Sequence, residues 1–417
     1  MNDAKSSINL PFSNVTRELS LSCPSAHTRA QRSNSPYFCC TGGVSIDRFE
    51  RGVGFSSSTS LLSVMSTLAR ILLAFALLRA GAKASDAGLE LFRSGTSNFS
   101  WSQGKHVCYR IPSLVKTSNA ILAVVAERIQ GASGFCSDDS EVNLVVRRSV
   151  DGGDTWSETA LIRSLASPSS PWTVVDDRTG RIFVFYNTNA DNCRCNVSFV
   201  TSSDDGASFA ATSVDLPASS GAYGSALTHG ITHRTTGRLV GCMRRICKNS
   251  CPAQYNAKSF FSDDRGSTWN ASSWLADGTT ECQVAELADG SLYMNFRPYR
   301  GWDGPKNKRL AAWSNDVGET WSRVVAVPDL DDWGFADEGS LASDPDADRV
   351  FFVHPHAHDR SNLTLWRSSG NATSWTVVDT VYAGEAAYSD ALVLDRTVGV
   401  LFEADGYGRV LFTKVSV

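Results

Sequence analysis

The sequence predicts an all-β fold, a six-bladed β-propeller, from three observations. A turn of the pattern Ser-x-Asp-x-Gly-x-Thr/Ser-aromatic occurs four times, beginning at Ser149, Ser202, Ser262 and Ser314. The segments that flank these turns are rich in β-branched and aromatic residues, which is typical of strands. No long segment beyond residue 85 has the 3.6-residue hydrophobic period of a helix. A repeat of 50 to 60 residues therefore predicts an array of similar sheets.

Each copy of the repeat predicts the tip of a hairpin. Its Asp and Ser side chains hydrogen-bond nearby backbone N–H groups, and its Gly supplies a positive φ angle. The aromatic residue that ends the copy is expected to pack under the turn. A degenerate fifth copy begins at Ser368 but lacks the Asp and the Gly. One four-stranded sheet per repeat, arranged radially, gives a propeller, and residues 85–417 are long enough for about six blades.

The strands that flank the turns are clearest in three places. They are expected at residues 141–148, before the first turn, at 181–186, after it, and at 349–353. Each of these segments is bounded by turn-forming residues, as strands of a sheet are.

The charge of the propeller region excludes some classes of partner. Residues 85–417 carry 30 Lys and Arg against 39 Asp and Glu, a net charge of −9. Such a balance argues against nucleic acid or another polyanion as a partner. An anionic ligand would need a local pocket of cationic side chains.

The first 84 residues differ in composition from the rest of the chain. Residues 1–64 are polar, rich in Ser and poorly patterned, so we assign them no fold. Residues 65–84 contain a basic residue, an apolar core and a small-x-small end, which is typical of a signal peptide. We therefore expect translation to start at Met65, with residues 1–64 an artefact of the gene model. The alternative is that residues 65–84 form a signal anchor associated with a membrane, although the apolar core is short for a span.

The cysteines and glycosylation sequons of the remaining chain suit secretion. Eight Cys follow residue 84, an even number that fits disulfides in an oxidising compartment, although their spacing does not give the pairing. Free buried thiols are the alternative, and a zinc site at Cys242, Cys247 and Cys251 is less expected because no His lies at ligand spacing. Five Asn-x-Ser/Thr sequons begin at Asn98, Asn196, Asn270, Asn362 and Asn371.

Several short motifs along residues 90–417 carry a resemblance to a known family. They are Tyr109-Arg110-Ile111-Pro112, Ala126-Glu127-Arg128, Asp138-Asp139, the segment from Glu281 to Arg297, the segment from Arg360 to Trp366, Ala387-Tyr388-Ser389-Asp390, and Leu401-Phe402-Glu403. Together with the turn repeats, known in that family as Asp-boxes, they resemble the exo-α-sialidases (neuraminidases), which are six-bladed propellers. The motifs look closer to the animal lysosomal and cytosolic enzymes than to the bacterial ones.

The resemblance implies a set of residues that bind the substrate. Arg110, Arg297 and Arg360 would grip the carboxylate that a sialic acid bears on its anomeric carbon, each through a planar fork of donors. Glu403 would orient Arg110, since a buried Arg without a partner is costly. Glu127 and Arg128 match pocket positions of the family.

The resemblance also implies the residues that perform the reaction. A substrate carboxylate repels a carboxylate nucleophile, whereas a Tyr hydroxyl arrives neutral, and sialidases are the exception that uses Tyr. Tyr388 is the implied nucleophile, with Glu281 as the base that removes its proton. Asp138 is the implied general acid, which must stay partly protonated at the working pH. Asp139, also placed in the pocket, is the alternative acid.

The sequence therefore predicts an exo-α-sialidase that is secreted or lysosomal. It would release terminal α-linked sialic acids from glycoproteins, glycolipids and oligosaccharides, with net retention and without a metal or cofactor. Sialylated glycans are the predicted partners, and no residue indicates a protein partner. The alternatives are a trans-sialidase, which passes the sugar to another glycan, and a non-catalytic propeller that binds sialic acid.

Overall fold

The computed structural model describes residues 88–130, 136–166, 169–191, 194–216, 227–245, 255–305, 307–332 and 337–417. All of them belong to one compact unit. The expectations for residues 1–64 and 65–84 fall outside the described residues. Within the described ranges, no helix is long and apolar enough to cross a membrane.

The described residues form an all-β fold, in which the one helix is the 3-10 turn η2 (Pro345–Ala347). Four of its sheets contain four or five antiparallel strands each, connected in chain order. Their strands are β2 (Gly95–Thr96), β3 (His106–Lys116), β4 (Ile121–Ile129), β5 (Val142–Ser149) and β6 (Ala160–Leu165); β7 (Trp172–Asp176), β8 (Arg181–Asp191), β9 (Arg194–Ser202) and β10 (Val214–Asp215); β11 (Ile231–Thr232), β12 (Leu239–Arg244), β13 (Ala257–Ser262) and β14 (Asn270–Ala271); and β15 (Thr279–Glu286), β16 (Leu292–Pro298), β17 (Lys308–Ser314) and β18 (Val325–Asp331).

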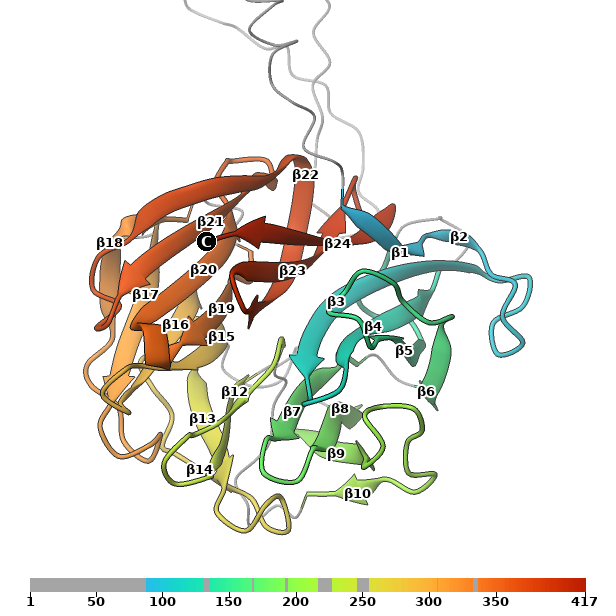
Figure 1. The fold of residues 1–417 in the computed structure, drawn as a ribbon, viewed down its shortest axis with the longest axis horizontal. Coiled ribbons are helices and arrows are strands. Elements are labelled where there is room, and N and C mark those ends of the chain that lie inside the picture. The colour runs from blue at the N-terminus through green and yellow to red at the C-terminus, as the bar shows by residue number, and fades with distance from the viewer. Residues whose placement is uncertain are drawn as a thin grey trace, which may run out of the picture. The chain divides into compact units, whose positions relative to one another are not determined.

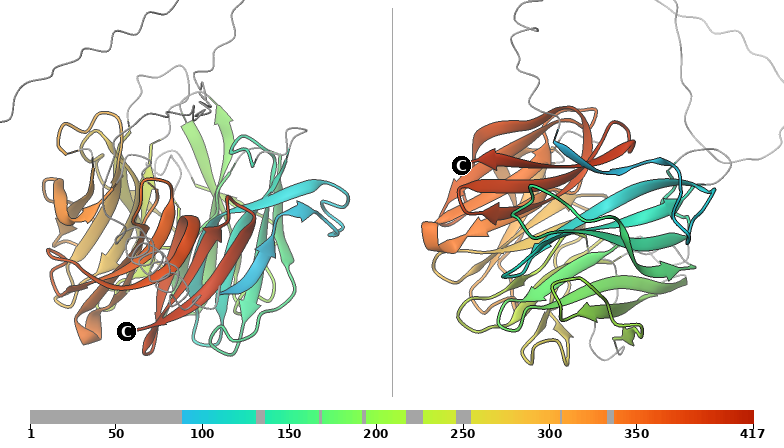
Figure 2. Two further views of the ribbon diagram at one scale, coloured as in Figure 1. Left: turned by 90° about the horizontal axis from the view of Figure 1, so that it is seen from above. Right: turned by 45° about the vertical axis from the view of Figure 1, so that its right-hand side comes forward.

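A fifth sheet has seven strands in the order β1-β24-β23-β22-β21-β20-β19. Its first strand in the chain, β1, pairs with the last strand, β24, so the two ends of the described chain meet in one sheet (Figure 2). The strands are β1 (Leu89–Arg93), β19 (Ser340–Asp344), β20 (Arg349–Pro355), β21 (Ser361–Ser369), β22 (Thr376–Leu394), β23 (Thr397–Ala404) and β24 (Arg409–Ser416).

The sheets stand around a common centre, as Figure 1 shows. Six of the described strands form the innermost ring, in the order β3, β7, β11, β15, β19 and β22, and β22 lies against β3 to close it. A cavity of about 380 Å³ at one end of this ring is lined by residues of all six strands. This radial arrangement of sheets is that of a β-propeller.

The four repeated turns form the hydrogen bonds that their sequence predicts. In the turn that begins at Ser262, the Ser262 hydroxyl accepts from Gly266 N at 2.7 Å and donates to Asp264 at 2.9 Å. Asp264 in turn accepts from the backbone N–H of Thr268 at 2.7 Å. The turns at Ser149, Ser202 and Ser314 repeat this pattern.

The aromatic residue of the turn joins one sheet to the next. Trp269, from the turn between β13 and β14, is buried, and its ring centroid lies 5.0 Å from that of Phe185 and 5.8 Å from that of Phe183, both on β8 of the neighbouring sheet. Because such edge-to-face pairs bury large areas, each repeat stabilises the contact between successive sheets as well as its own hairpin.

The turn glycines give a direct test of this packing. Gly266 has φ +81°, and a Cβ there would lie 2.2 Å from the Phe183 ring, whereas at Gly152, with φ +73°, a Cβ would meet no atom within 4 Å. We expect Gly266→Ala to lower the free energy of unfolding by about 2–4 kcal/mol, from both overpacking and left-handed strain. Gly152→Ala should cost about 1 kcal/mol, from strain alone. Denaturant unfolding measures both, and equal losses would contradict the proposed contact.

Candidate active site

The site begins with an irregularity in strand β3. The pairing of β3 with β4 shifts register between Arg110 and Ser113, and Ile111 has φ +58°. A β-branched residue rarely adopts this left-handed conformation, which persists only where surrounding contacts hold it and is common at functional sites. The contact here is a hydrogen bond from Ile111 N to the Glu403 carboxylate at 2.8 Å.

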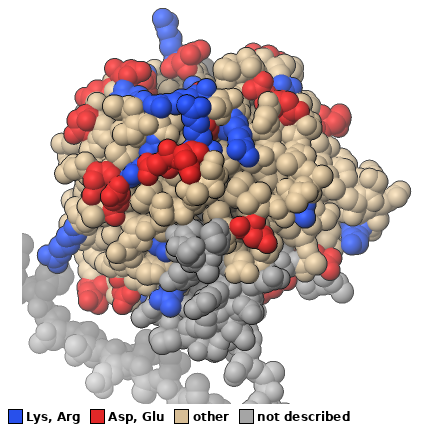
Figure 3. All heavy atoms as spheres, turned by 90° about the horizontal axis from the view of Figure 1, so that it is seen from below, with Lys and Arg blue, Asp and Glu red and all other residues tan. Residues whose placement is uncertain are grey.

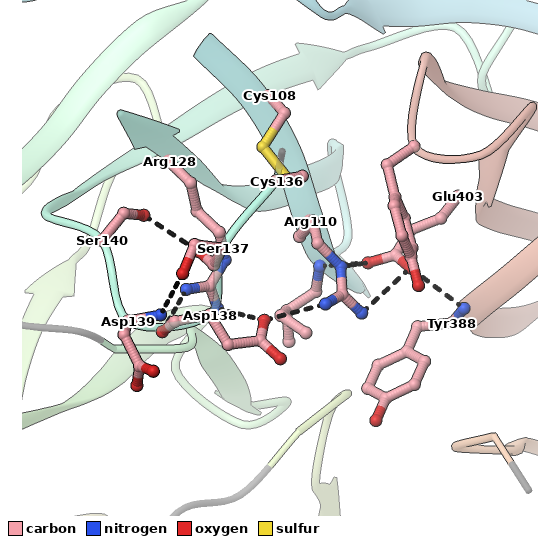
Figure 4. A network of polar contacts seen from close by, with 12 residues as sticks. Cys108, Arg110, Arg128, Cys136, Ser137, Asp138, Asp139, Ser140, Tyr388 and Glu403 are labelled. Carbon is pink, nitrogen blue, oxygen red and sulfur yellow. Dashed lines mark hydrogen bonds and ion pairs between the residues drawn. A yellow bond between two sulfur atoms is a disulfide. The ribbon is translucent and has the colours of Figure 1, made fainter. Parts of the chain in front are cut away.

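The fully buried Glu403, on β23, connects three parts of the site. Its carboxylate accepts from Arg110 Nε at 3.1 Å and Nη2 at 3.3 Å, and from the backbone N–H of Tyr388 at 3.3 Å (Figure 4). Burial by itself would lower the pKa of the Arg110 guanidinium, but the carboxylates of Glu403 and Asp138 raise it well above its ordinary value. Glu403 therefore keeps a buried Arg charged and fixed.

Tyr388 and Glu281 form the most direct contact of the site. The Tyr388 hydroxyl, on β22, donates to Glu281 Oε1, on β15, at 2.5 Å. Arg297, on β16, donates through Nη1 to Glu281 Oε2 at 2.6 Å and to the Tyr388 hydroxyl oxygen at 3.0 Å. Tyr388 and Glu281 are both buried, whereas the Arg297 side chain is partly exposed.

The charges around Glu281 determine whether Tyr388 or Glu281 carries the proton between them. Burial by itself would raise the pKa of the Glu281 carboxyl, but the guanidinium charges of Arg297 and Arg244 outweigh it and lower that pKa to about 2. Burial, and then the charge of Glu281, raise the pKa of the Tyr388 hydroxyl well above its ordinary value. In this structure the proton is therefore on Tyr388 and the negative charge on Glu281.

Arg360 reaches the same place from the loop directly before β21. Its Nη1 donates to the Tyr407 hydroxyl at 2.8 Å, and its Nη2 lies 2.9 Å from Asp337 Oδ1. Burial raises the pKa of the Asp337 carboxyl to about 8, although the Arg360 charge opposes this. Asp337 is then largely neutral at pH 7, and the positive charge of Arg360 is not cancelled.

The structure brings the three predicted arginines together at Tyr388. The guanidinium carbons of Arg110 and Arg360 lie 5.1 Å and 5.8 Å from the centre of the Tyr388 ring, and Arg297 donates to its hydroxyl. Three cations from strands β3, β16 and the loop before β21 thus surround one phenol. Such a cluster can bind an anionic group directly beside the hydroxyl.

The loop that carries Asp138 is tied to β3 by a disulfide between Cys108 and Cys136. Asp138 Oδ1 accepts from Arg110 Nη1 at 2.8 Å, and its backbone oxygen accepts from Arg128 Nη1 at 2.9 Å. The Asp138 side chain is 68% exposed. Figure 4 shows its carboxylate directed toward Arg110 and that of Asp139 directed away.

Glu127 is not part of this cluster, contrary to the pocket role implied by the sequence. On β4 it pairs with Tyr109, whereas Arg128 pairs with Cys108. Because adjacent residues of a strand point to opposite faces, Glu127 lies on the other face of the sheet from Arg128. There it is fully buried and accepts hydrogen bonds from Trp101, Ser102 and Asn143, each at 2.8 to 2.9 Å.

A second polar layer lies beneath Tyr388 and Glu281. Gln283 and Asp390 follow Glu281 and Tyr388 by two positions, so they share the same strand faces. Asp390 accepts from the backbone N–H of Leu114 at 2.8 Å and contacts His229 Nδ1 at 2.8 Å, and Gln283 Nε2 donates to it at 3.2 Å. This layer ties β3, β15 and β22 to one another directly below the site.

The sequence did not indicate Arg244, Asp337, Glu338 or Tyr407 as parts of the site. They lie in segments that carried none of the motifs quoted above, so only the fold brings them there. Cys242, considered earlier as a zinc ligand, forms a disulfide with Cys282, while Cys247 and Cys251 lie outside the described residues. Among the residues that the structure describes, no three or more His, Cys, Asp or Glu are grouped so as to hold a metal ion.

The chain matches a known family and several curated proteins. The family described as BNR repeat-like domain matches residues 129–400. A sialidase of Micromonospora viridifaciens is 28% identical over 335 residues, covering 71% of this chain and 50% of that protein. A sialidase of Bacteroides fragilis is 25% identical over 365 residues, covering 77% and 64%, and Sialidase-2 of Cricetulus griseus is 24% identical over 357 residues, covering 73% and 91%. The match thus spans about half to two thirds of the two bacterial proteins.

Solved structures show the same fold. A Hadza microbial sialidase aligns with TM-score 0.62 at 24% identity, covering 75% of this chain and 68% of that one. The Trypanosoma rangeli sialidase in complex with 2,3-difluorosialic acid aligns with TM-score 0.60 at 20% identity, covering 78% and 58%. Because the family match covers most of the described propeller, this chain belongs to the BNR repeat-like domain family.

Proposed function

We propose that the protein is an exo-α-sialidase that hydrolyses terminal α-linked sialic acids of glycoproteins, glycolipids and oligosaccharides. The observation that carries the proposal is the 2.5 Å hydrogen bond from the Tyr388 hydroxyl to Glu281, beside three converging arginines. A phenol paired with a buried carboxylate suits a nucleophile for a substrate that is itself an anion. Figure 3 shows basic and acidic side chains interspersed on the face it displays, and not a continuous basic surface. The attraction for an anionic substrate would therefore come from the local cluster of arginines.

Arg110, Arg297 and Arg360 would bind the carboxylate of the substrate. Each guanidinium offers planar paired donors that match a carboxylate, and a largely neutral Asp337 leaves the charge of Arg360 available to an anion. Asp138 Oδ1 already occupies Arg110 Nη1 in this structure. A bound substrate carboxylate would displace it, freeing the Asp138 side chain toward the leaving group, which favours Asp138 over Asp139 as the acid.

The first chemical step joins the sugar to Tyr388. The phenol oxygen attacks the anomeric carbon, Glu281 takes the phenol proton, and the bond to the leaving oxygen breaks as Asp138 protonates that oxygen. Glu281 is a weak base while both arginines face it. When the substrate carboxylate shares the charge of Arg297, Glu281 becomes more basic, so binding itself would prepare the base.

The second step releases the sialic acid. Water attacks the anomeric carbon as Asp138 takes its proton, and the bond to Tyr388 breaks as Glu281 returns the proton to the phenol oxygen. Two inversions give net retention of configuration. A glycan hydroxyl in place of the water would give transfer instead of hydrolysis.

The propeller is proposed to have six blades. Strand β22 pairs with β21 as far as Glu385 and with β23 from Ala386 onward. The seven-stranded sheet would then supply two blades that share this strand, and the other four sheets one each. The ring of six innermost strands supports the same division.

The protein is further proposed to act in the secretory pathway, as a secreted or lysosomal enzyme. The disulfides Cys108–Cys136 and Cys242–Cys282 support this, since such bonds persist in oxidising compartments. A signal or anchor at residues 65–84 remains a prediction.

Replacement of the nucleophile tests the proposed reaction. We expect the full chain to hydrolyse a fluorogenic α-sialoside, and Tyr388→Phe to lower kcat about 10³-fold or more with KM changed less than about tenfold, because the three arginines remain. Tyr382→Phe is the matched control, since Tyr382 lies on the same strand but donates to the exposed Asp405; it should keep the parent's activity.

Two outcomes would contradict this reaction. Full turnover by Tyr388→Phe would remove Tyr388 as nucleophile. No turnover by the parent between about pH 4 and pH 8 would exclude the hydrolase, and sialoside binding or transfer to an added glycan would then select between the two alternatives.

A second prediction concerns the carboxylate that orients Arg110. Glu403→Gln removes the charge that compensates a buried guanidinium, and we expect the free energy of unfolding to fall by about 3–5 kcal/mol. Glu90→Gln, which alters a surface pair with Arg93, should cost about 1 kcal/mol or less. Denaturant unfolding of both variants measures the difference, and similar losses would show that Glu403 does not carry this charge balance.

A further inference from the structure

A fourth arginine contacts the reactive pair from another strand. Arg244 is the last residue of β12, and its Nη1 lies 2.6 Å from Glu281 Oε1. This is the same oxygen that accepts the Tyr388 hydroxyl, whereas Arg297 contacts Oε2. The two arginines therefore hold the carboxylate from its two oxygens, and the side chain of Arg244 is 23% exposed.

The backbone around Arg244 is fixed relative to Glu281. A disulfide joins Cys242, two residues before Arg244, to Cys282, which follows Glu281. Arg244 pairs with Ala257, whose N–H donates to Thr279 Oγ1 at 2.9 Å, at the start of β15. The distance between Arg244 and Glu281 is thus set by a covalent link and by a hydrogen bond between neighbouring strands.

We propose that Arg244 is a positioning residue, which holds the Glu281 carboxylate against the Tyr388 hydroxyl while Arg297 engages the carboxylate of the substrate. The proposal rests on the proposed function and adds a residue to it. Arg244 acts through Glu281 and not on the sugar, so its removal should affect turnover more than binding.

The surroundings of Glu281 explain why one arginine is not enough. Among the described residues, the charged or titratable side chains that interact electrostatically with Glu281 include Arg244, Arg297, Arg309, Tyr388, Asp332, Asp337 and Glu338. Arg309 is itself paired with Asp332 at 3.2 Å. When the substrate carboxylate binds Arg297, Arg244 is the described cation that remains to pair with Glu281. Without Arg244, Glu281 would be a buried carboxylate with no counter-charge, which is costly.

A further buried carboxyl group, that of Glu338, interacts electrostatically with Glu281. It is fully buried, and neither of its carboxyl oxygens has a hydrogen-bond partner among the described residues. Burial, and then the charges of Glu281 and Asp390, raise its pKa well above the ordinary value, which favours the neutral form beside the charged Glu281. A neutral Glu338 adds no second negative charge, but Arg244 still has to balance the charge of Glu281.

The test compares the parent full chain with Arg244→Met and Arg244→Lys on a fluorogenic α-sialoside. Arg244→Met should lower kcat about 10²-fold with KM within about threefold of the parent. Arg244 lowers the pKa of Glu281, so its loss raises that pKa. The acidic limb of the kcat profile should therefore move to higher pH by about one unit. Arg244→Lys keeps a cation and should recover most of the turnover.

Arg238→Met is the matched control. Arg238 lies directly before β12 and pairs with the exposed Asp263 and Glu319, so its loss should leave kcat and the pH profile unchanged. A tenfold rise in KM for Arg244→Met with unchanged kcat would overturn the proposal, because it would make Arg244 a substrate ligand. An unmoved acidic limb would overturn it as well.

A measurement that needs no activity separates this proposal from the proposed function. In a double-mutant cycle of Arg244→Met and Glu281→Gln, the midpoint of thermal unfolding should fall less in the double variant than the sum of the two single losses. Additive losses would overturn the coupling of Arg244 to Glu281. If the parent hydrolyses no sialoside but the cycle is non-additive, the proposed function is excluded while the ion pair between Arg244 and Glu281 is still supported.

Discussion

The charge of Arg110, buried where three strands meet, is the constraint on which the rest of the site depends. A buried guanidinium needs a fixed counter-charge, and Glu403 supplies it while accepting from the backbone of Ile111 and Tyr388. The same carboxylate therefore holds the bulge in β3 and the position of β22. Electrostatic balance and strand geometry are not separate here, because one side chain satisfies both. The strained conformation of Ile111 persists since releasing it would leave Glu403 without one of its donors.

The balance of charges also suits a phenol at the centre of this site. Three arginines, Arg110, Arg297 and Arg360, converge on Tyr388. Each contacts a carboxyl group, which is that of Glu403, Glu281 and Asp337, respectively. The carboxyl groups are not equivalent: Arg297 and Arg244 hold Glu281 ionised, whereas burial keeps Asp337 largely neutral. The site thus retains positive charge toward the space beside Tyr388, with anionic charge on the side that faces the strands. A carboxylate at the position of Tyr388 would cancel that attraction.

Much of the fold follows from local sequence, and part of the site does not. The Ser-x-Asp-x-Gly turns contain their own hydrogen-bond partners within a few residues, so the repeat predicts its own structure. Tyr388 and Glu281, from two of the short motifs, are more than one hundred positions apart in the sequence and meet through strands β22 and β15. Arg244 and Asp337 could not be found in this way, because only closure of the ring of inner strands brings them to Glu281 and Arg360. Glu127 lies apart from the pocket that the resemblance implies for it, because it adjoins Arg128 on one strand, where alternation of side chains puts the two on opposite faces.

The pairing of β1 with β24 has a consequence for how the chain must fold. Leu89 lies opposite Phe412, more than three hundred positions later in the sequence. During synthesis the segment that becomes β1 has no partner until the ribosome has made almost all of the rest, so its edge stays open to wrong partners. A contact of such sequence separation also carries a large loop-closure entropy, which slows the final step of folding. Closure of this propeller is therefore a late event in folding. A chain whose synthesis stopped before β24 would leave β1 without the strand that it pairs with.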